Sequence, residues 1–498
     1  MRQTIATLLA VLLLAAQPHA ARAADAQKRT SRITIVYDAS YAANLYWLVN
    51  ALAGYEHADS AAYRAWWQAH TRPDPADETH LATFRALRDT YRGQYLDSPD
   101  AATDSPIPVP PPHDADLATK FSALFMTSRT MDEVYGKAEV LLRDRDVTRL
   151  LQVFRHFDRR FSPSWPSLSY VADHAKRFPS QPMTRVLEDT LDRAAELLGV
   201  APDASISVRV VFAFAGSRKV LHGNAFGGGT NLLVEIPKDP DPLCQADVVV
   251  HEVCHMLDRE GGARESKAFM NAMLSTGLPS AIPALGLMSE GLATAIGQGV
   301  FQERTDPEQF GKRLTTPRSF YMDDAIDRYA KTILPVVKTA IEEKRSLVSI
   351  APELVAGFER AFAGHALTPL AMLNNYVLVG GRRDTELFAP YFEVVPPRSL
   401  WHTSMAEAAG MLKRYAAATA VIPLLPEDLK LLEADRQALD LTDDEWATLR
   451  DGRCGVLTKK RQFNGFVFLV QAPDRQKLRD TLAKFGRMPR LQPGWTTL

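Results

Sequence analysis

The pentapeptide His251-Glu252-Val253-Cys254-His255 follows the apolar run Val248-Val249-Val250 and precedes Met256-Leu257. Two histidines four residues apart lie on one face of a helix, with Cβ atoms about 5–6 Å apart. Both imidazoles can therefore reach one zinc ion, and Glu252 lies where a base can take a proton from a bound water. The alternative is a surface helix, but the apolar flanks favour a buried helix whose polar residues need a partner such as a metal.

A catalytic zinc takes three protein ligands and leaves one position open. For the third ligand we favour Glu290, in the segment Ser289-Glu290-Gly291-Leu292-Ala293, because the chain before it is long enough for a loop and a second helix. The small Gly291 and Ala293 would let that helix pack closely against the histidine helix. Glu290 can instead be a carboxylate that the N-terminal end of a helix stabilises.

Two further residues near the histidines, Asp258 and Cys254, are not interpreted as metal ligands. Asp258 lies one turn after His255 and either orients an imidazole or is a solvated helix residue. Cys254 points about 100° away from His255 and is interpreted as a small buried hydrophobe. With Cys244 and Cys454 it makes only three cysteines, a count that does not predict a disulfide framework.

The N-terminus has the features of a secretory signal peptide. Arg2 provides the positive charge, Ile5 to Ala16 the apolar segment, and Ala21-Arg22-Ala23 the small residues of a cleavage site. The alternative is a retained anchor, but the apolar segment is short for a bilayer. We expect an exported protein, periplasmic or secreted, without stable membrane insertion after the signal is removed.

Composition places few limits on function. The chain has 498 residues, which suggests two to three domains, and 46% of them are hydrophobic, enough for a large core. The 58 basic and 59 acidic residues leave a net charge of −1, so no charge bias indicates nucleic acid as a partner.

The pattern along the chain predicts a predominantly helical α+β fold. Residues 33–37 form a strand and residues 41–93 helices. Strands at 206–212 and 232–236 enclose a glycine-rich loop before the histidine helix, and the chain from 346 mixes helices with a hairpin around Asn464-Gly465. The expected regions are a signal peptide (1–23), a mainly helical region (24–200), a core with a small mixed or antiparallel sheet (201–345) and a C-terminal α+β region (346–498).

The two histidines and Glu290 together resemble the gluzincin branch of zinc metallopeptidases, the thermolysin-like proteins. The shared residues are His251-Glu252-x-x-His255 and Glu290-Gly291-Leu292-Ala293, and Asn224-Ala225-Phe226 resembles the start of the substrate-binding edge strand of that family. The metzincin pattern is excluded, because Asp258 and Gly261 stand where it has glycine and histidine. The resemblance covers about residues 205 to 300 and implies a zincin-like core.

The resemblance implies that His251, His255 and Glu290 bind Zn²⁺ and that Glu252 is the general base. It also implies that the strand at 232–236 binds an extended peptide by β-addition.

Two features depart from the family. Thr294 stands where related proteins often have an aspartate that holds the first histidine, so that contact comes from elsewhere, such as Asp258. The donor for the oxyanion is unassigned among His365, Tyr376 and Tyr329.

These features predict an exported zinc metallopeptidase that hydrolyses peptide bonds by Glu-assisted attack of a zinc-bound water on a peptide or protein substrate. The alternative is an exported binding or scaffold protein with a zincin-like core that binds zinc without catalysis. A third reading is an exported helical protein without a metal. For residues 24–200 we favour a permanent subdomain over a removable prosegment. The sequence specifies neither the substrate nor the oligomeric state.

Overall fold

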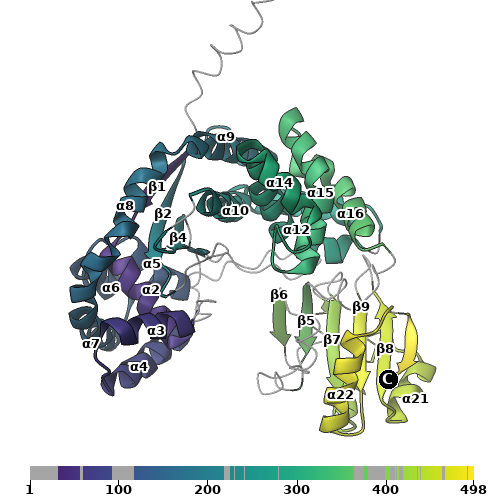
Figure 1. Ribbon diagram of the computed structural model, residues 1–498. Helices are drawn as coiled ribbons and strands as arrows, with labels where there is room; N and C mark the ends of the chain where they lie inside the picture. Colours follow the sequence, from purple (N-terminus) through teal and green to yellow (C-terminus); the bar gives the residue numbers. More distant parts are fainter. Residues whose placement is uncertain are drawn as a thin grey trace, which may run out of the picture.

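The computed structural model describes residues 32–55, 60–91, 117–217, 225–228, 230–239, 242–278, 280–363, 375–379, 387, 399–403, 410, 412–413, 419–433, 436–437, 439–461, 466–490 and 492–498. The expected signal peptide, the turn Asn464-Gly465 and His365 lie outside these residues. The fold is α+β and predominantly helical, with two small sheets, as predicted (Figure 1). Among the described residues, no helix combines the length and apolar character needed to cross a membrane.

Helices dominate the N-terminal part of the chain. In α7, apolar residues recur every three or four positions from Val147 to Phe161 and are buried, which is the pattern of a helix with one face on a core. Thr130 caps α6 by accepting a hydrogen bond from the Glu133 amide at 3.3 Å. The helices are α2 (Tyr41–Ala53), α3 (Ser60–His70), α4 (Ala76–Tyr91), α5 (Leu117–Met126), α6 (Met131–Leu141), α7 (Asp144–Phe161), α8 (Ser169–Arg177) and α9 (Pro182–Leu197), with 3₁₀ turns η2 (Ser162–Leu168) and η3 (Phe178–Ser180).

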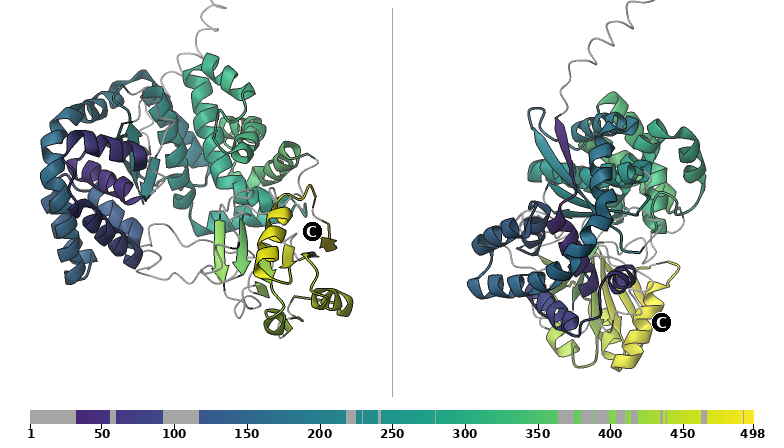
Figure 2. Two further views of the ribbon diagram at one scale, coloured as in Figure 1. Left: turned by 60° about the horizontal axis from the view of Figure 1, so that its bottom comes forward. Right: turned by 60° about the vertical axis from the view of Figure 1, so that its left-hand side comes forward.

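The first sheet joins distant parts of the chain. Its order is β1 (Ile33–Asp38), β2 (Ile206–Phe214), β4 (Asn231–Ile236) and β3 (Ala225–Gly228), in which only the β3–β4 pair is antiparallel. The register pairs Ile33 with Ile206, and the right view of Figure 2 shows β1 beside β2. One hydrophobic core extends from Ile33 to Phe362, so the predicted boundary at residue 200 runs through a shared sheet and a shared core.

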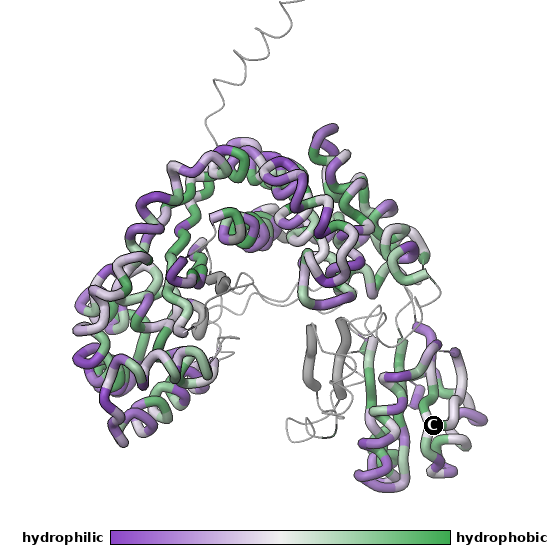
Figure 3. The backbone as a smooth tube through the Cα atoms, in the orientation of Figure 1, coloured by the Kyte–Doolittle hydropathy of each residue, from purple (hydrophilic) through white to green (hydrophobic). Residues whose placement is uncertain are grey.

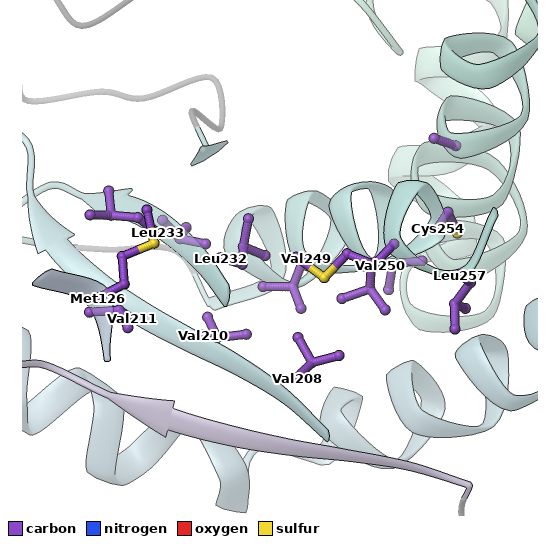
Figure 4. Close-up of a cluster of buried hydrophobic side chains, with 14 of the residues drawn as sticks. Met126, Val208, Val210, Val211, Leu232, Leu233, Val249, Val250, Cys254 and Leu257 are labelled. Carbon is purple, nitrogen blue, oxygen red and sulfur yellow. The ribbon is translucent and has the colours of Figure 1, made fainter. Parts of the chain in front are cut away.

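The long helix α10 (Pro242–Glu260) packs on this sheet. Figure 4 shows valine and leucine side chains of α10 facing those of β2 and β4. Val249 and Val250 are fully buried, and burial of one such side chain contributes about 1.5–3 kcal/mol. Cys254 is 3% exposed and carries a free thiol, which confirms its interpretation as a buried hydrophobe. The sheet thus fixes the apolar face of α10 and leaves the histidine face for other contacts.

A set of helices follows and covers α10 on the other side (Figure 1). Pro283 lies in the first turn of α12 and does not interrupt it, because an N–H is not needed there. The helices are α11 (Gly262–Leu274), α12 (Ala281–Thr294), a π-helical segment η4 (Ala295–Phe301), α13 (Gln302–Thr305), α14 (Pro307–Thr315), α15 (Asp324–Glu343) and α16 (Leu347–Ala361).

The C-terminal region contains a second, six-stranded sheet with its own hydrophobic clusters. The predicted hairpin is confirmed as an antiparallel β8–β9 pair, and Figure 3 shows that β7 and β9 are hydrophobic. In sheet order the strands are β10 (Gly494–Thr497), β8 (Gly455–Lys460), β9 (Phe466–Gln471), β7 (Thr419–Leu424), β5 (Asn375–Val379) and β6 (Ser399–Thr403), accompanied by α20 (Leu429–Glu433), α21 (Asp443–Arg450) and α22 (Arg475–Gly486).

Candidate metal centre

The structure brings together the three residues that the sequence nominates as ligands. His251 and His255 come from α10 and Glu290 from α12. The two Nε2 atoms are 3.2 Å apart. The Glu290 carboxylate lies 3.3 Å from Nε2 of His251 and 3.6 Å from Nε2 of His255. Three donor atoms therefore surround one point.

This spacing fits a tetrahedral ion. Donor atoms that lie about 2.0–2.2 Å from a tetrahedral zinc are about 3.3–3.6 Å apart from one another. The two nitrogens are 3.2 Å apart, Oε2 of Glu290 lies 3.3 Å from His251, and Oε1 lies 3.6 Å from His255, all close to these values. In addition, Oε2 of Glu290 is buried and has no hydrogen-bond partner, a state that a bound cation would relieve. The nitrogen and oxygen donors suit zinc.

Hydrogen bonds at the far side of each ring orient the two imidazoles. Nδ1 of His255 lies 2.9 Å from the Ser289 hydroxyl, and Nδ1 of His251 lies 3.4 Å from the Gln298 side-chain oxygen. With Nε2 directed at the centre, each Nδ1–H donates to these oxygens, which fixes the tautomer that binds a metal. Neither partner is Asp258.

The π-helical segment after α12 reaches α10 through a glycine. A Cβ atom at Gly297 would lie 2.8 Å from the carbonyl oxygen of Asp247 and 3.2 Å from Cβ of His251. Only glycine therefore allows this approach, and it places the next residue, Gln298, against His251. Gly291, for which we expected this role, packs instead on the ring of Tyr329, where a Cβ would be 2.7 Å from Cδ1.

Tyr321 is a further residue at the centre. Its ring stacks on His251, with centroids 5.8 Å apart and planes at 24°, and its side chain hydrogen-bonds to Glu290. The buried Asp327 holds the loop that carries it, because the carboxylate accepts hydrogen bonds from the backbone amides of Arg318, Phe320 and Tyr321 at 2.8–3.3 Å. A phenol is thereby fixed beside two of the three donors.

The charges of the centre are set by burial and by mutual contact. Burial would raise the pKa of Glu290, but its interactions with His251 and His255 outweigh burial and lower the pKa to about 2. Burial would lower the pKa of His251, but Glu290 and Glu252 raise it above its ordinary value. Burial raises the pKa of Glu252 to about 7. Glu290 is therefore ionised, and Glu252 can accept a proton near neutral pH.

Of the three residues that we considered as donors to the oxyanion, the structure places neither Tyr329 nor Tyr376 beside the candidate ligands. The Tyr329 hydroxyl donates to the backbone oxygen of Leu354 at 3.2 Å, and the side chain is fully buried beneath α12. Tyr376 lies in β5, in the second sheet, and His365 lies outside the described residues. Tyr321 is instead the tyrosine that the structure places next to the candidate ligands His251 and Glu290.

The edge strand of the sheet near α10 is β3, not the strand at 232–236 that we expected. We expected residues 232–236 to accept a peptide, but β4 is paired on both sides, with β2 and β3. Its backbone groups are therefore already used. The short β3, which begins with the Ala225-Phe226 of the quoted resemblance, forms the edge of the sheet beside α10.

A second group of metal-binding residue types lies in the N-terminal region. Asp74, Asp77 and His156 also come within the reach of one ion. However, Asp77 already accepts hydrogen bonds from His156 at 2.7 Å, from the Trp67 indole at 3.0 Å and from Arg160. The guanidinium of Arg160 takes the place that a cation would occupy.

Sequence reasoning missed Ser289, Gln298 and Tyr321. Ser289 directly precedes Glu290, so its closeness in sequence to a candidate ligand could have suggested it, whereas Gln298 lies in the π-helical segment after α12, where the α-helical period does not apply. No comparable signal marks Tyr321, whose position depends on a loop.

Comparisons with protein-family models, with curated proteins and with solved structures each give no match.

Proposed function

We propose that this protein is an exported zinc-dependent metallopeptidase with a zincin-like core. The observation that carries the proposal is the convergence of two imidazole nitrogens and the Glu290 carboxylate from two helices, with contacts of 3.2–3.6 Å. His251, His255 and Glu290 would hold the ion. A zinc ion in such a site acts as a Lewis acid and lowers the pKa of a bound water.

Glu252 is the proton acceptor in this proposal. It follows His251 directly, and burial keeps its pKa at about 7, near the value that suits transfer in both directions at neutral pH. It takes a proton from the attacking water and delivers it to the leaving amine. A residue with no catalytic role would have little reason to keep a partly buried carboxylate at this position.

Tyr321 and β3 complete the proposed site. The Tyr321 hydroxyl lies close to Glu290 and is the donor that we assign to the developing oxyanion. The outer edge of β3, which pairs with no other described strand, offers backbone hydrogen bonds to an extended peptide, with the strand assignment moved from 232–236 to Ala225–Gly228.

The test measures metal and hydrolysis in the same preparations. Purified protein should contain about one zinc per chain by mass spectrometry and should cleave a mixture of quenched-fluorescent peptides, with activity lost on chelation and restored by zinc. Glu252→Gln should keep the zinc and lose about 10³-fold or more in kcat/KM. Glu260→Gln, at an exposed position on the same helix, is the matched control and should behave like the wild type.

Two results would contradict the proposal. Full activity of Glu252→Gln would remove the assigned base. Stoichiometric zinc without cleavage of any peptide would favour the binding or scaffold protein instead.

A further inference from the structure

A small cavity lies next to the metal centre and has no role in the proposed chemistry. It has a volume of about 190 Å³ and lies between the end of α10 and helices α9, α11, α12 and α16. Its walls are largely apolar and include Leu285, Met288, Leu292, Phe269 and Leu347. Pockets for whole drug-sized ligands measure about 300–1,000 Å³, so this one suits a single side chain.

The cavity is lined by residues that neighbour the candidate metal ligands. Asp258 lines it and lies three residues after His255, on the same face of α10 as both histidines. Ser289 also lines it, and its hydroxyl is the group that accepts the hydrogen bond from Nδ1 of His255. The cavity therefore borders His255 on its Nδ1 side, within one helical turn of the candidate ligands along α10.

The charged residues that line the cavity are both acidic. Asp258 from α10 and Glu265 from α11 are partly buried, and none of the described residues forms an ion pair or hydrogen bond with either carboxylate. No lysine, arginine or histidine is among the described residues of the lining. Burial raises the pKa of Asp258 by more than the charge of the neighbouring Arg259 lowers it. A carboxylate in an apolar setting gains from a cation.

We propose that this cavity receives the side chain of a substrate lysine or arginine adjacent to the cleaved bond. The aliphatic stem packs on Leu285, Met288 and Phe269, and the cationic end lies near Asp258 and Glu265. This inference rests on the proposed peptidase function. A metal ion fits the cavity less well, since Ca²⁺ takes six to eight oxygen ligands and these walls are apolar. Lysine and arginine combine an apolar stem with a charged tip in the way that these walls require.

The test first maps cleavage sites and then compares matched peptides. Mass spectrometry of a digested, unfolded protein gives the residues on each side of the cleaved bonds. Four quenched-fluorescent peptides then carry lysine, arginine, norleucine or glutamate at the enriched position. Norleucine keeps the aliphatic stem and removes the charge, so it isolates the contribution of the two carboxylates.

Two variants remove the charges of the cavity one at a time. Asp258→Asn and Glu265→Gln should each lower kcat/KM for the lysine and arginine peptides by about 10- to 100-fold, the effect of one charged hydrogen bond. Cleavage of the norleucine peptide should be unchanged. Glu260→Gln removes an exposed charge from the same end of α10 and should alter none of the rates. Zinc content and melting temperature, measured for each variant, show that the fold is retained.

The outcomes separate this inference from the function on which it rests. Cleavage that shows no preference for lysine or arginine, or a preference that both variants retain, overturns the cavity assignment and leaves the peptidase standing. Wild-type protein that binds zinc and cleaves none of the peptides overturns both. In a further variant, Asp258→Lys, faster cleavage of the glutamate peptide than of the lysine peptide would support the assignment.

Discussion

Two groups in this molecule combine histidine with carboxylates, and their surroundings differ. At the metal centre, Glu290 faces two imidazole nitrogens, and one of its oxygens is buried without a hydrogen bond. In the N-terminal group, Asp77 accepts hydrogen bonds from His156, from Trp67 and from the guanidinium of Arg160. The second group contains the permanent positive charge of Arg160, whereas Glu290 in the first group is paired with histidines.

The difference shows why residue type alone is a poor guide to a metal site. Both groups contain the right atoms at the right separations. In the N-terminal group, Arg160 also donates to the carbonyl of Arg72 and lies 4.8 Å from the Trp67 ring centroid, so it is a fixed part of the packing between α3 and α7. A metal would have to displace it. At the candidate metal centre, the ion pairs of Glu290 are with His251 and His255.

The largest expected effect breaks the metal centre itself. His255→Ala removes one of the three donors, and zinc content should fall from about one equivalent to near zero, since a two-donor site binds zinc weakly. Asp77→Asn should leave zinc content unchanged. Mass spectrometry after dialysis against a weak chelator measures both. Equal zinc loss in the two variants would mean that the N-terminal group binds the metal.

The buried His174 should make the stability of the fold depend on pH. His174 is buried among aromatic rings, and burial, with the charge of Arg177, lowers its pKa to about 4. The neutral ring therefore stabilises the fold above pH 6.5, and this contribution is lost as the pH falls from about 6.5 to about 4. The loss should reach about 3 kcal/mol.

Urea unfolding at several pH values measures this loss. His174→Leu should unfold with a smaller dependence on pH over the same range, because the titrating ring is gone. His70→Gln, at an exposed histidine, is the control and should keep most of the wild-type dependence. An unchanged pH dependence in His174→Leu would contradict the assignment.

The smallest effect concerns the cation of the N-terminal group. Arg160→Leu leaves Asp77 with two hydrogen bonds and no permanent positive charge, and the side chains are partly buried, at 18% and 20% exposure. We expect a loss of about 1–2 kcal/mol in the free energy of unfolding. The variant should also bind a second zinc ion weakly by calorimetry, which the wild type should not. No change in either quantity would mean that Arg160 is not the competing cation.

Much of the candidate metal centre follows from short-range patterns in the sequence. The spacing of His251 and His255 fixes their common helix face, and Glu290 needs only a second helix to reach them. These features depend on the 3.6-residue period, which a sequence displays directly. The same holds for β1, β2 and the β8–β9 hairpin, whose residues alternate or are continuously apolar.

Other features depend on contacts between distant residues. Tyr321 reaches Glu290 because Asp327 holds a loop, and the sequence contains no period that marks this arrangement. The edge position of β3 depends on the order of strands in the sheet, and a strand pattern does not give that order. Similarly, the need for glycine at position 297 becomes visible only when the segment after α12 is packed against α10.

The pairing of β1 with β2 sets a limit on how the N-terminus can be processed. Ile33 is the first residue of a strand that covers one edge of β2, which is almost entirely buried. Cleavage at the expected site after Ala23 would leave this strand intact, whereas trimming beyond Ile33 would expose a long apolar edge. Such an edge pairs readily with other chains. Ragged N-terminal proteolysis should therefore show itself first as aggregation.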